Sequence, residues 1–78
     1  MKSAVAPPPP PILVERIAAL GARIRSARQH RQLRQIDLAE RTGLSRSTIE
    51  AIEKGSFETG IGAYARALWV MGLDGEST

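Results

Sequence analysis

The chain has 78 residues, of which 11 are Lys or Arg and 8 are Asp or Glu, so its formal charge is +3. Cysteine is absent, which excludes disulfide scaffolds, cysteine-based zinc sites and thiol enzymes. No run of about 18 apolar residues could span a membrane, and Ala4-Val5-Ala6 lacks the preceding apolar segment of an export signal. We therefore expect a small cytoplasmic domain without metal or cofactor.

The first segment, residues 1–11, ends in five consecutive prolines from Pro7 to Pro11. Proline fixes φ and has no N–H to donate, so this proline-rich tail is expected to be polyproline II or disordered. We interpret it as a stiff tail, with a docking peptide for a proline-binding module as the alternative. One domain is expected over residues 12–73, followed by a flexible C-terminus at residues 74–78.

From Ile12 the apolar residues recur with the 3.6-residue period of a helix. Glycine costs about 1 kcal/mol relative to alanine inside a helix, so a break or bend is possible at Gly21. The helix is expected to end near Arg31, with residues 32–34 as a short connection. Its apolar stripe consists of Leu13, Ile17, Leu20, Ile24 and Ala27.

A second helix is predicted from about Gln35 to Arg41, with Asp37 in its first turn. Arg34 precedes it and is a poor N-cap, at a cost of about 1 kcal/mol. Residues 42–44 are expected to form a turn in which Gly43 has positive φ.

A third helix is predicted to begin after Ser45, a good N-cap, and to reach Lys54 before Gly55 stops it. After a loop at residues 56–60, a fourth helix is predicted that Gly72 terminates. No strand-like alternation is present, so the fold class is all-α. The apolar residues of the fourth helix are Ile61, Tyr64, Ala65, Leu68 and Trp69.

Two short helices joined by a turn that contains glycine are typical of a helix-turn-helix. Residues 35–55 have this pattern: Ala39 is small where the helices would cross, and Gly43 lies where the chain must reverse. The expected shared core is Leu38, Leu44, Ile49 and Ile52.

On these residues the chain resembles the Cro/lambda-repressor (XRE) family of bacterial helix-turn-helix proteins. The resemblance runs from about Leu20 to Leu73. It implies a compact four-helix domain that binds operator DNA as a two-fold dimer and acts as a transcriptional repressor or regulator. The motifs are Leu20-Gly-Ala-Arg-Ile-Arg, Gln35-x-x-Leu-Ala, Thr42-Gly-Leu-Ser, Ser47-Thr-Ile-Glu, Ile52-Glu-Lys-Gly and Tyr64-Ala-Arg-Ala-Leu.

The chain departs from the family at its C-terminal end. Trp69 stands where the family commonly has a glycine, and with the sequence given as far as Thr78 we expect no fifth helix, so the dimer surface stays open. Trp69, Met71 and Leu73 are expected in the core by default, or at a subunit or partner interface. Ile12-Leu13-Val14 is the second candidate for such an interface.

Positive charge is concentrated around the motif. Residues 16–54 contain nine Lys or Arg and four acids, a net +5, whereas residues 55–78 contain one Arg and three acids, a net −2. Neutralising DNA phosphates requires such clustering. The alternative is that these arginines only solvate the helices.

The first turn of the third helix is expected to meet base edges in the major groove. Arg46 could read guanine through O6 and N7 or act as a phosphate clamp, and Ser47 and Thr48 could contact bases or phosphates. By resemblance Ala51 lies on the base-facing side, and Glu50 is expected to pair with Arg46 or Lys54.

A second set of residues is expected to position the protein on the DNA backbone. By resemblance Gln35 contacts the backbone, with a plain helix-start role as its alternative, and Arg28 and Glu53 match a family ion pair between the first and third helices. The expected phosphate contacts are Gln35, Arg31, Arg34, Ser45 and Lys54.

Catalysis is not expected, because His30 is the sole histidine and no paired carboxylates or phosphate-binding glycine loop accompany it. Two settings compete for a DNA-binding protein: a stand-alone regulator, or the antitoxin of a toxin–antitoxin operon (HipB-like) with a toxin as protein partner. A third hypothesis is a helix-turn-helix used only for protein interaction.

Overall fold

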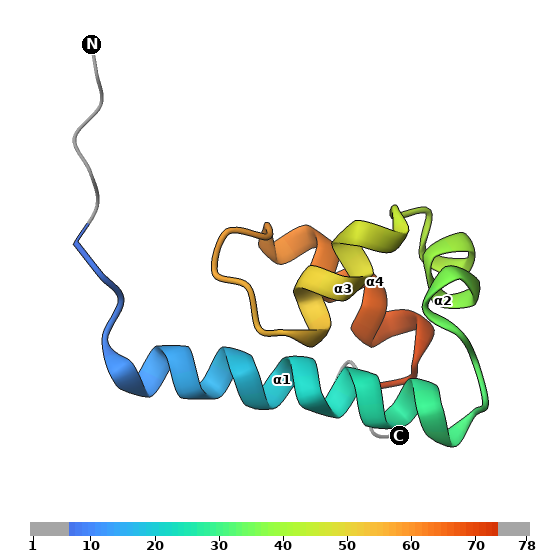
Figure 1. Ribbon diagram of the computed structural model, residues 1–78, viewed down its shortest axis with the longest axis horizontal. Coiled ribbons are helices and arrows are strands. Elements are labelled where there is room, and N and C mark those ends of the chain that lie inside the picture. The colour runs from blue at the N-terminus through green and yellow to red at the C-terminus, as the bar shows by residue number, and fades with distance from the viewer. Residues whose placement is uncertain (1–6, 74–78) are drawn as a thin grey trace, which may run out of the picture.

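The structure, a computed structural model, describes residues 7–73. Within that range it contains four helices and no strand, which confirms the all-α prediction. In Figure 1, α1 extends along the long axis and the three shorter helices are grouped on one side of it. The outer parts of the predicted tail and C-terminus, residues 1–6 and 74–78, lie outside the described residues. The bounds are α1 Pro11–His30, α2 Gln35–Thr42, α3 Arg46–Glu53 and α4 Ile61–Val70.

The first helix begins at Pro11, one residue earlier than predicted. Proline suits the first helical turn, because its fixed φ is helical and its missing N–H would have no partner there. The helix continues unbroken through Gly21, so the break or bend considered for that position does not occur. On the predicted stripe Ile24 is fully buried, while Leu13 is exposed. The partly buried members are Ile17, Leu20 and Ala27.

Gly21 lies where the backbone at the end of α3 packs directly against α1, which leaves no space for a side chain. A Cβ at this position would come within 3.0 Å of the carbonyl oxygen of Ile52 and would lie 3.1 Å from the backbone nitrogen of Gly55. A Cβ on Gly55, where φ is +77°, would in turn lie 2.7 Å from the Cα of Ala18. Two glycines therefore allow the backbones of α1 and α3 to touch.

All four helices contribute to one hydrophobic core. Met71, which follows α4, is 1% exposed, so it lies in the core, as expected by default, and not at the interface considered as its alternative. Leu73 packs against that core, whereas Trp69 is 72% exposed. The buried members are Ile24, Leu38, Ala39, Ile49, Ile52, Tyr64, Ala67 and Met71.

The turn between α2 and α3 has the predicted geometry. Gly43 has φ +78°, and Thr42, one residue beyond the expected helix end, is buried. Its hydroxyl donates to the carbonyl of Leu38 at 2.8 Å and accepts from the N–H of Leu44 at 3.3 Å. Ser45 caps α3, its Oγ accepting from the N–H of Thr48 at 3.1 Å. The turn is thus fixed by its own side chains as well as by glycine.

The N-terminus of α2 is capped by the side chain of Asp37, at its third helical position, and not by the N-cap residue Arg34. Arg34 has no cap oxygen to offer, but the carboxylate of Asp37 accepts from the backbone N–H of Arg34 at 2.7 Å. The Arg34 guanidinium donates to the same carboxylate at 2.9 and 3.1 Å. This is half of a capping box, and it offsets the cost expected from a poor N-cap.

We predict that Asp37 titrates with a pKa of about 2 in the folded chain, below its ordinary value of 3.8. The cause is hydrogen bonding by the Arg34 side chain and then by its backbone N–H. Because the folded pKa is the lower one, the ionised carboxylate stabilises the fold above about pH 4, and this contribution is lost as the pH falls toward about 2. NMR titration of the carboxyl carbon measures this pKa. An Asp37→Asn variant should lose this part of the acid dependence, whereas titration of Asp37 near 3.8 would show that the capping contact does not form.

Candidate functional site

The outward side of α3 presents an uninterrupted row of polar and small side chains. Arg46, Ser47 and Lys54 are exposed, and Thr48, Glu50 and Ala51 are half-buried. The opposite side holds Ile49 and Ile52, which are fully buried. A helix with one side in the core and its first turn in solvent offers that turn to a partner. The four residues predicted to face a ligand, Arg46, Ser47, Thr48 and Ala51, therefore all retain some exposure.

Arg46 and Glu50 form the pair expected at i and i+4, with 3.7 Å between guanidinium nitrogen and carboxylate oxygen. The side chains of Arg46 and Glu50 are 62% and 43% exposed and the contact is long, so the pair is worth no more than about 0.5 kcal/mol. Lys54 is the other partner considered for Glu50, and among residues 7–73 its ammonium lies within 4 Å of no carboxylate. Arg46 can therefore leave Glu50 for a stronger acceptor at little cost.

Three hydroxyls meet at the first turn of α3. The Oγ of Ser45 lies 3.1 Å from that of Ser47 and 2.9 Å from Oγ1 of Thr48. Since Ser45 also caps the helix, its hydroxyl is committed to the fold before any ligand arrives. Its expected phosphate contact remains a prediction.

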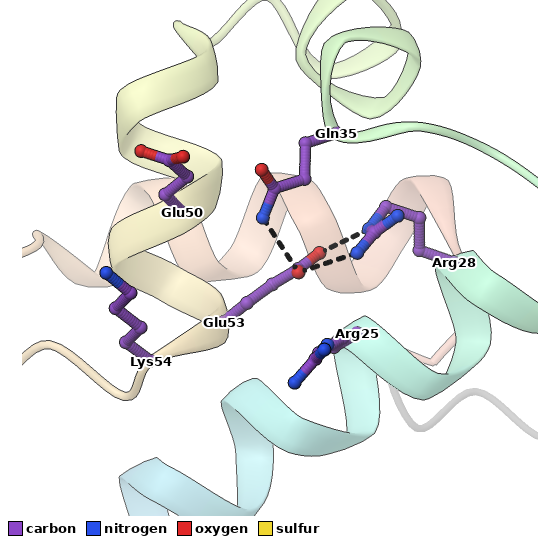
Figure 2. A pocket seen from close by; sticks show the side chains of 6 residues that line it. All are labelled: Arg25, Arg28, Gln35, Glu50, Glu53 and Lys54. Carbon is purple, nitrogen blue, oxygen red and sulfur yellow. Dashed lines mark hydrogen bonds and ion pairs between the residues drawn. The ribbon is translucent and has the colours of Figure 1, made fainter.

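The expected ion pair between Arg28 and Glu53 is present and ties α1 to α3 (Figure 2). Nε and Nη2 of Arg28 donate to the two carboxylate oxygens at 2.6 and 3.0 Å, and Nη1 donates to the carbonyl of Leu33 at 2.7 Å. The side chains are 10% and 3% exposed. Hydrogen bonding to Glu53 raises the pKa of Arg28 above its ordinary value, so the guanidinium keeps its charge.

Gln35 joins this network from the start of α2. Its Nε2 donates to Oε1 of Glu53 at 3.1 Å, so one carboxylate holds both Arg28 and Gln35 (Figure 2). The first turn of α2 is thereby fixed relative to α3. Sequence reasoning treated Gln35 and the ion pair separately, because their contact depends on how α2 crosses α3.

A polar pocket of about 380 Å³ lies beside α3, between α1 and the start of α2 (Figure 2). Lys54 and Gln35 line it, and both belong to the predicted phosphate contacts. Arg25 lines it from α1 and was absent from the predicted site, because in the sequence it is one of several arginines off the apolar stripe. The six lining residues are Arg25, Arg28, Gln35, Glu50, Glu53 and Lys54.

Besides Ser45, the two arginines predicted to contact phosphate lie outside this pocket and have partners in the fold. Arg31 donates to the carbonyl of Met71 at 2.8 Å and so satisfies the C-terminal end of α4, a structural role that the sequence did not indicate. Arg31 is exposed and its guanidinium has further N–H groups, so the phosphate contact expected of it stays a prediction. Arg34 remains largely exposed in its contact with Asp37.

The chain matches a known protein family. Residues 21–67, more than half of the chain, match a family described as a helix-turn-helix domain, and the match includes all of α2 and α3. No curated protein and no solved structure matches the chain. Across residues 7–73, none of the helices has both the length and the apolar character that a membrane crossing requires.

Proposed function

Because the chain belongs to the helix-turn-helix domain family, a family of DNA-binding regulators, we propose that it binds double-stranded DNA through the outward side of α3. The observation that carries the proposal is the exposed first turn of α3 on a helix whose opposite side is buried. The α2–α3 turn and the Glu53 network hold that helix rigidly, which a recognition element requires.

Base recognition is proposed for the first two turns of α3. Arg46 would donate two hydrogen bonds to O6 and N7 of a guanine, and Ala51 would contact a thymine methyl. Ser47 and Thr48 would contact bases or neighbouring phosphates. The solvated Arg46–Glu50 pair supports this assignment, because its rupture costs little.

Backbone contacts are proposed for Gln35, Ser45 and Lys54, which flank α3, and for Arg34 at the start of α2. These contacts would fix register without reading sequence. The anchored amide of Gln35 supports this role, because a positioning group is effective only when it is held in place.

We further propose a dimer on an inverted repeat, with two copies of α3 in successive major grooves about 34 Å apart, repressing by covering promoter DNA. The exposed side chains of Trp69 and Ile61 on α4 support a protein contact there, because tryptophan is enriched at protein interfaces. An antitoxin would use such a surface for its toxin, and that setting requires a toxin gene next to this one.

The test is selection of bound fragments from random duplex DNA, followed by sizing of the complex. We predict that Arg46→Ala changes the preferred sequence, with a loss of about 1–3 kcal/mol at one base position. Arg34→Ala should instead weaken binding evenly across sequences. It should also lower the slope of log K against log salt concentration by about 1. Equal behaviour of both variants and the parent on every sequence would refute this contact map. Absence of DNA binding at low salt would favour a protein-interaction module.

A further inference from the structure

We infer that Arg25, acting with Lys54, binds a phosphate of the DNA backbone and so brings α1 into the DNA interface. The inference rests on the proposed function, since it assigns a positioning residue to the same interface. Neither the helix-turn-helix motif nor the family match, read as sequence, selects Arg25 among the arginines of α1.

Arg25 and Lys54 come together at one opening. Arg25 extends from α1 and Lys54 from the end of α3, and both line the polar pocket beside α3 (Figure 2). Both side chains are exposed, and among residues 7–73 neither lies within 4 Å of a carboxylate. Two cations from separate helices thus share one opening.

The polar pocket carries a net positive charge. Of the charged groups in the pocket, Arg28 and Glu53 neutralise each other at 2.6 Å, which leaves the cations Arg25 and Lys54 and the carboxylate of Glu50. The carboxylate of Glu53 is further covered by the amide of Gln35. Two cations against one carboxylate give the opening a net positive charge even when Arg46 leaves Glu50 for a base, so it favours an anion.

The position of the pocket favours a DNA phosphate as the anion. Glu50 and Lys54 belong both to the pocket and to the outward side of α3, so the pocket directly adjoins the proposed reading surface. A helix with side chains is about 10–12 Å wide and the major groove is about 12 Å wide, so a bound α3 has sugar-phosphate backbone along its flanks. The pocket lies on such a flank.

The test is DNA affinity as a function of salt for the full chain and its Arg25→Gln variant, using random-sequence duplexes. One lost phosphate contact should lower the slope of log K against log salt by about 0.9, which corresponds to about eightfold weaker binding at ~0.1 M salt. Arg25→Lys should restore most of the slope, because lysine also binds phosphate as a point charge. Arg25 makes no ion pair within residues 7–73, so the thermal unfolding of the variants should match that of the parent.

Arg23→Gln is the matched control. It removes the same charge from the same helix at an exposed position about 200° around the axis from Arg25, and it should leave the slope unchanged. An equal fall of the salt slope in Arg25→Gln and Arg23→Gln would overturn the inference. It would mean that the overall positive charge of the chain, and not a specific contact of Arg25, attracts the DNA. Unchanged binding by Arg25→Gln would overturn it while DNA binding itself stands, and a parent chain that binds no duplex would overturn both. Saturable binding of inorganic phosphate that depends on Arg25, with no effect of Arg25→Gln on DNA affinity, would show an anion site unrelated to DNA.

Discussion

Replacing Gly21 by alanine is expected to destabilise the fold by about 2 kcal/mol, although alanine is the better helix former. The added Cβ would come within 3.0 Å of the Ile52 carbonyl oxygen and would press on the backbone at Gly55. Backbone atoms cannot move aside as a flexible side chain can, so we expect overpacking at the upper end of its usual range, about 3 kcal/mol. The gain in helix propensity of about 1 kcal/mol offsets only part of this cost. The expected fall in Tm is about 8–16 °C for a domain of this size.

Gly62→Ala provides the control, because it is the same substitution in another helix. A Cβ at Gly62 meets nothing within 4 Å, so only the propensity term remains, and stability should rise by up to about 1 kcal/mol. Thermal unfolding followed by circular dichroism measures both variants. If Gly21→Ala were as stable as the parent, α1 and α3 could not lie at the distance described.

The close approach of α1 and α3 matters for function as well as for stability. The ion pair, the anchored Gln35 and the polar pocket all lie along the α1–α3 contact. An increase in that separation would weaken the Arg28–Glu53 bonds and release the start of α2. Gly21→Ala should therefore reduce DNA affinity even at temperatures where the variant is still folded.

The roles of residues that depend only on their neighbours along the chain were predictable from the sequence. Gly43 and Ser45 have the conformation and the cap that any chain with this pattern requires, and the alternation of buried and exposed positions in α3 follows from helical periodicity. The resemblance, rather than the periodicity, supplied the pairing of Arg28 with Glu53.

Residues whose role depends on how helices cross were not predictable. Gly21 was interpreted as a weak point of α1, yet it is the position that brings α3 close. Arg31 was placed on DNA by its charge, although its guanidinium satisfies the end of α4. In both cases the partner lies on a helix distant in sequence, and no spacing along the chain indicates it.

Glu53→Gln is expected to cost about 3 kcal/mol in the free energy of unfolding. It would leave the guanidinium of Arg28, which is 10% exposed, without a carboxylate, and removing one member of a buried pair is far more costly than removing both. The double variant Arg28→Met with Glu53→Leu should therefore regain most of the lost stability. Urea unfolding at neutral pH of the parent, the single and the double variant measures this. A loss below about 1 kcal/mol for Glu53→Gln would show that the pair behaves as a surface salt bridge.

The same double variant separates stability from DNA binding. With Glu53 replaced by leucine, the amide of Gln35 loses its acceptor, so the start of α2 is no longer tied to α3 even though the core is intact. We expect a folded protein whose DNA affinity is lower than that of the parent on every sequence, because the affected contact is with the backbone rather than with bases. Full affinity in a stable double variant would mean that α2 is positioned by its hydrophobic contacts alone, and Glu53 would then serve only to neutralise Arg28.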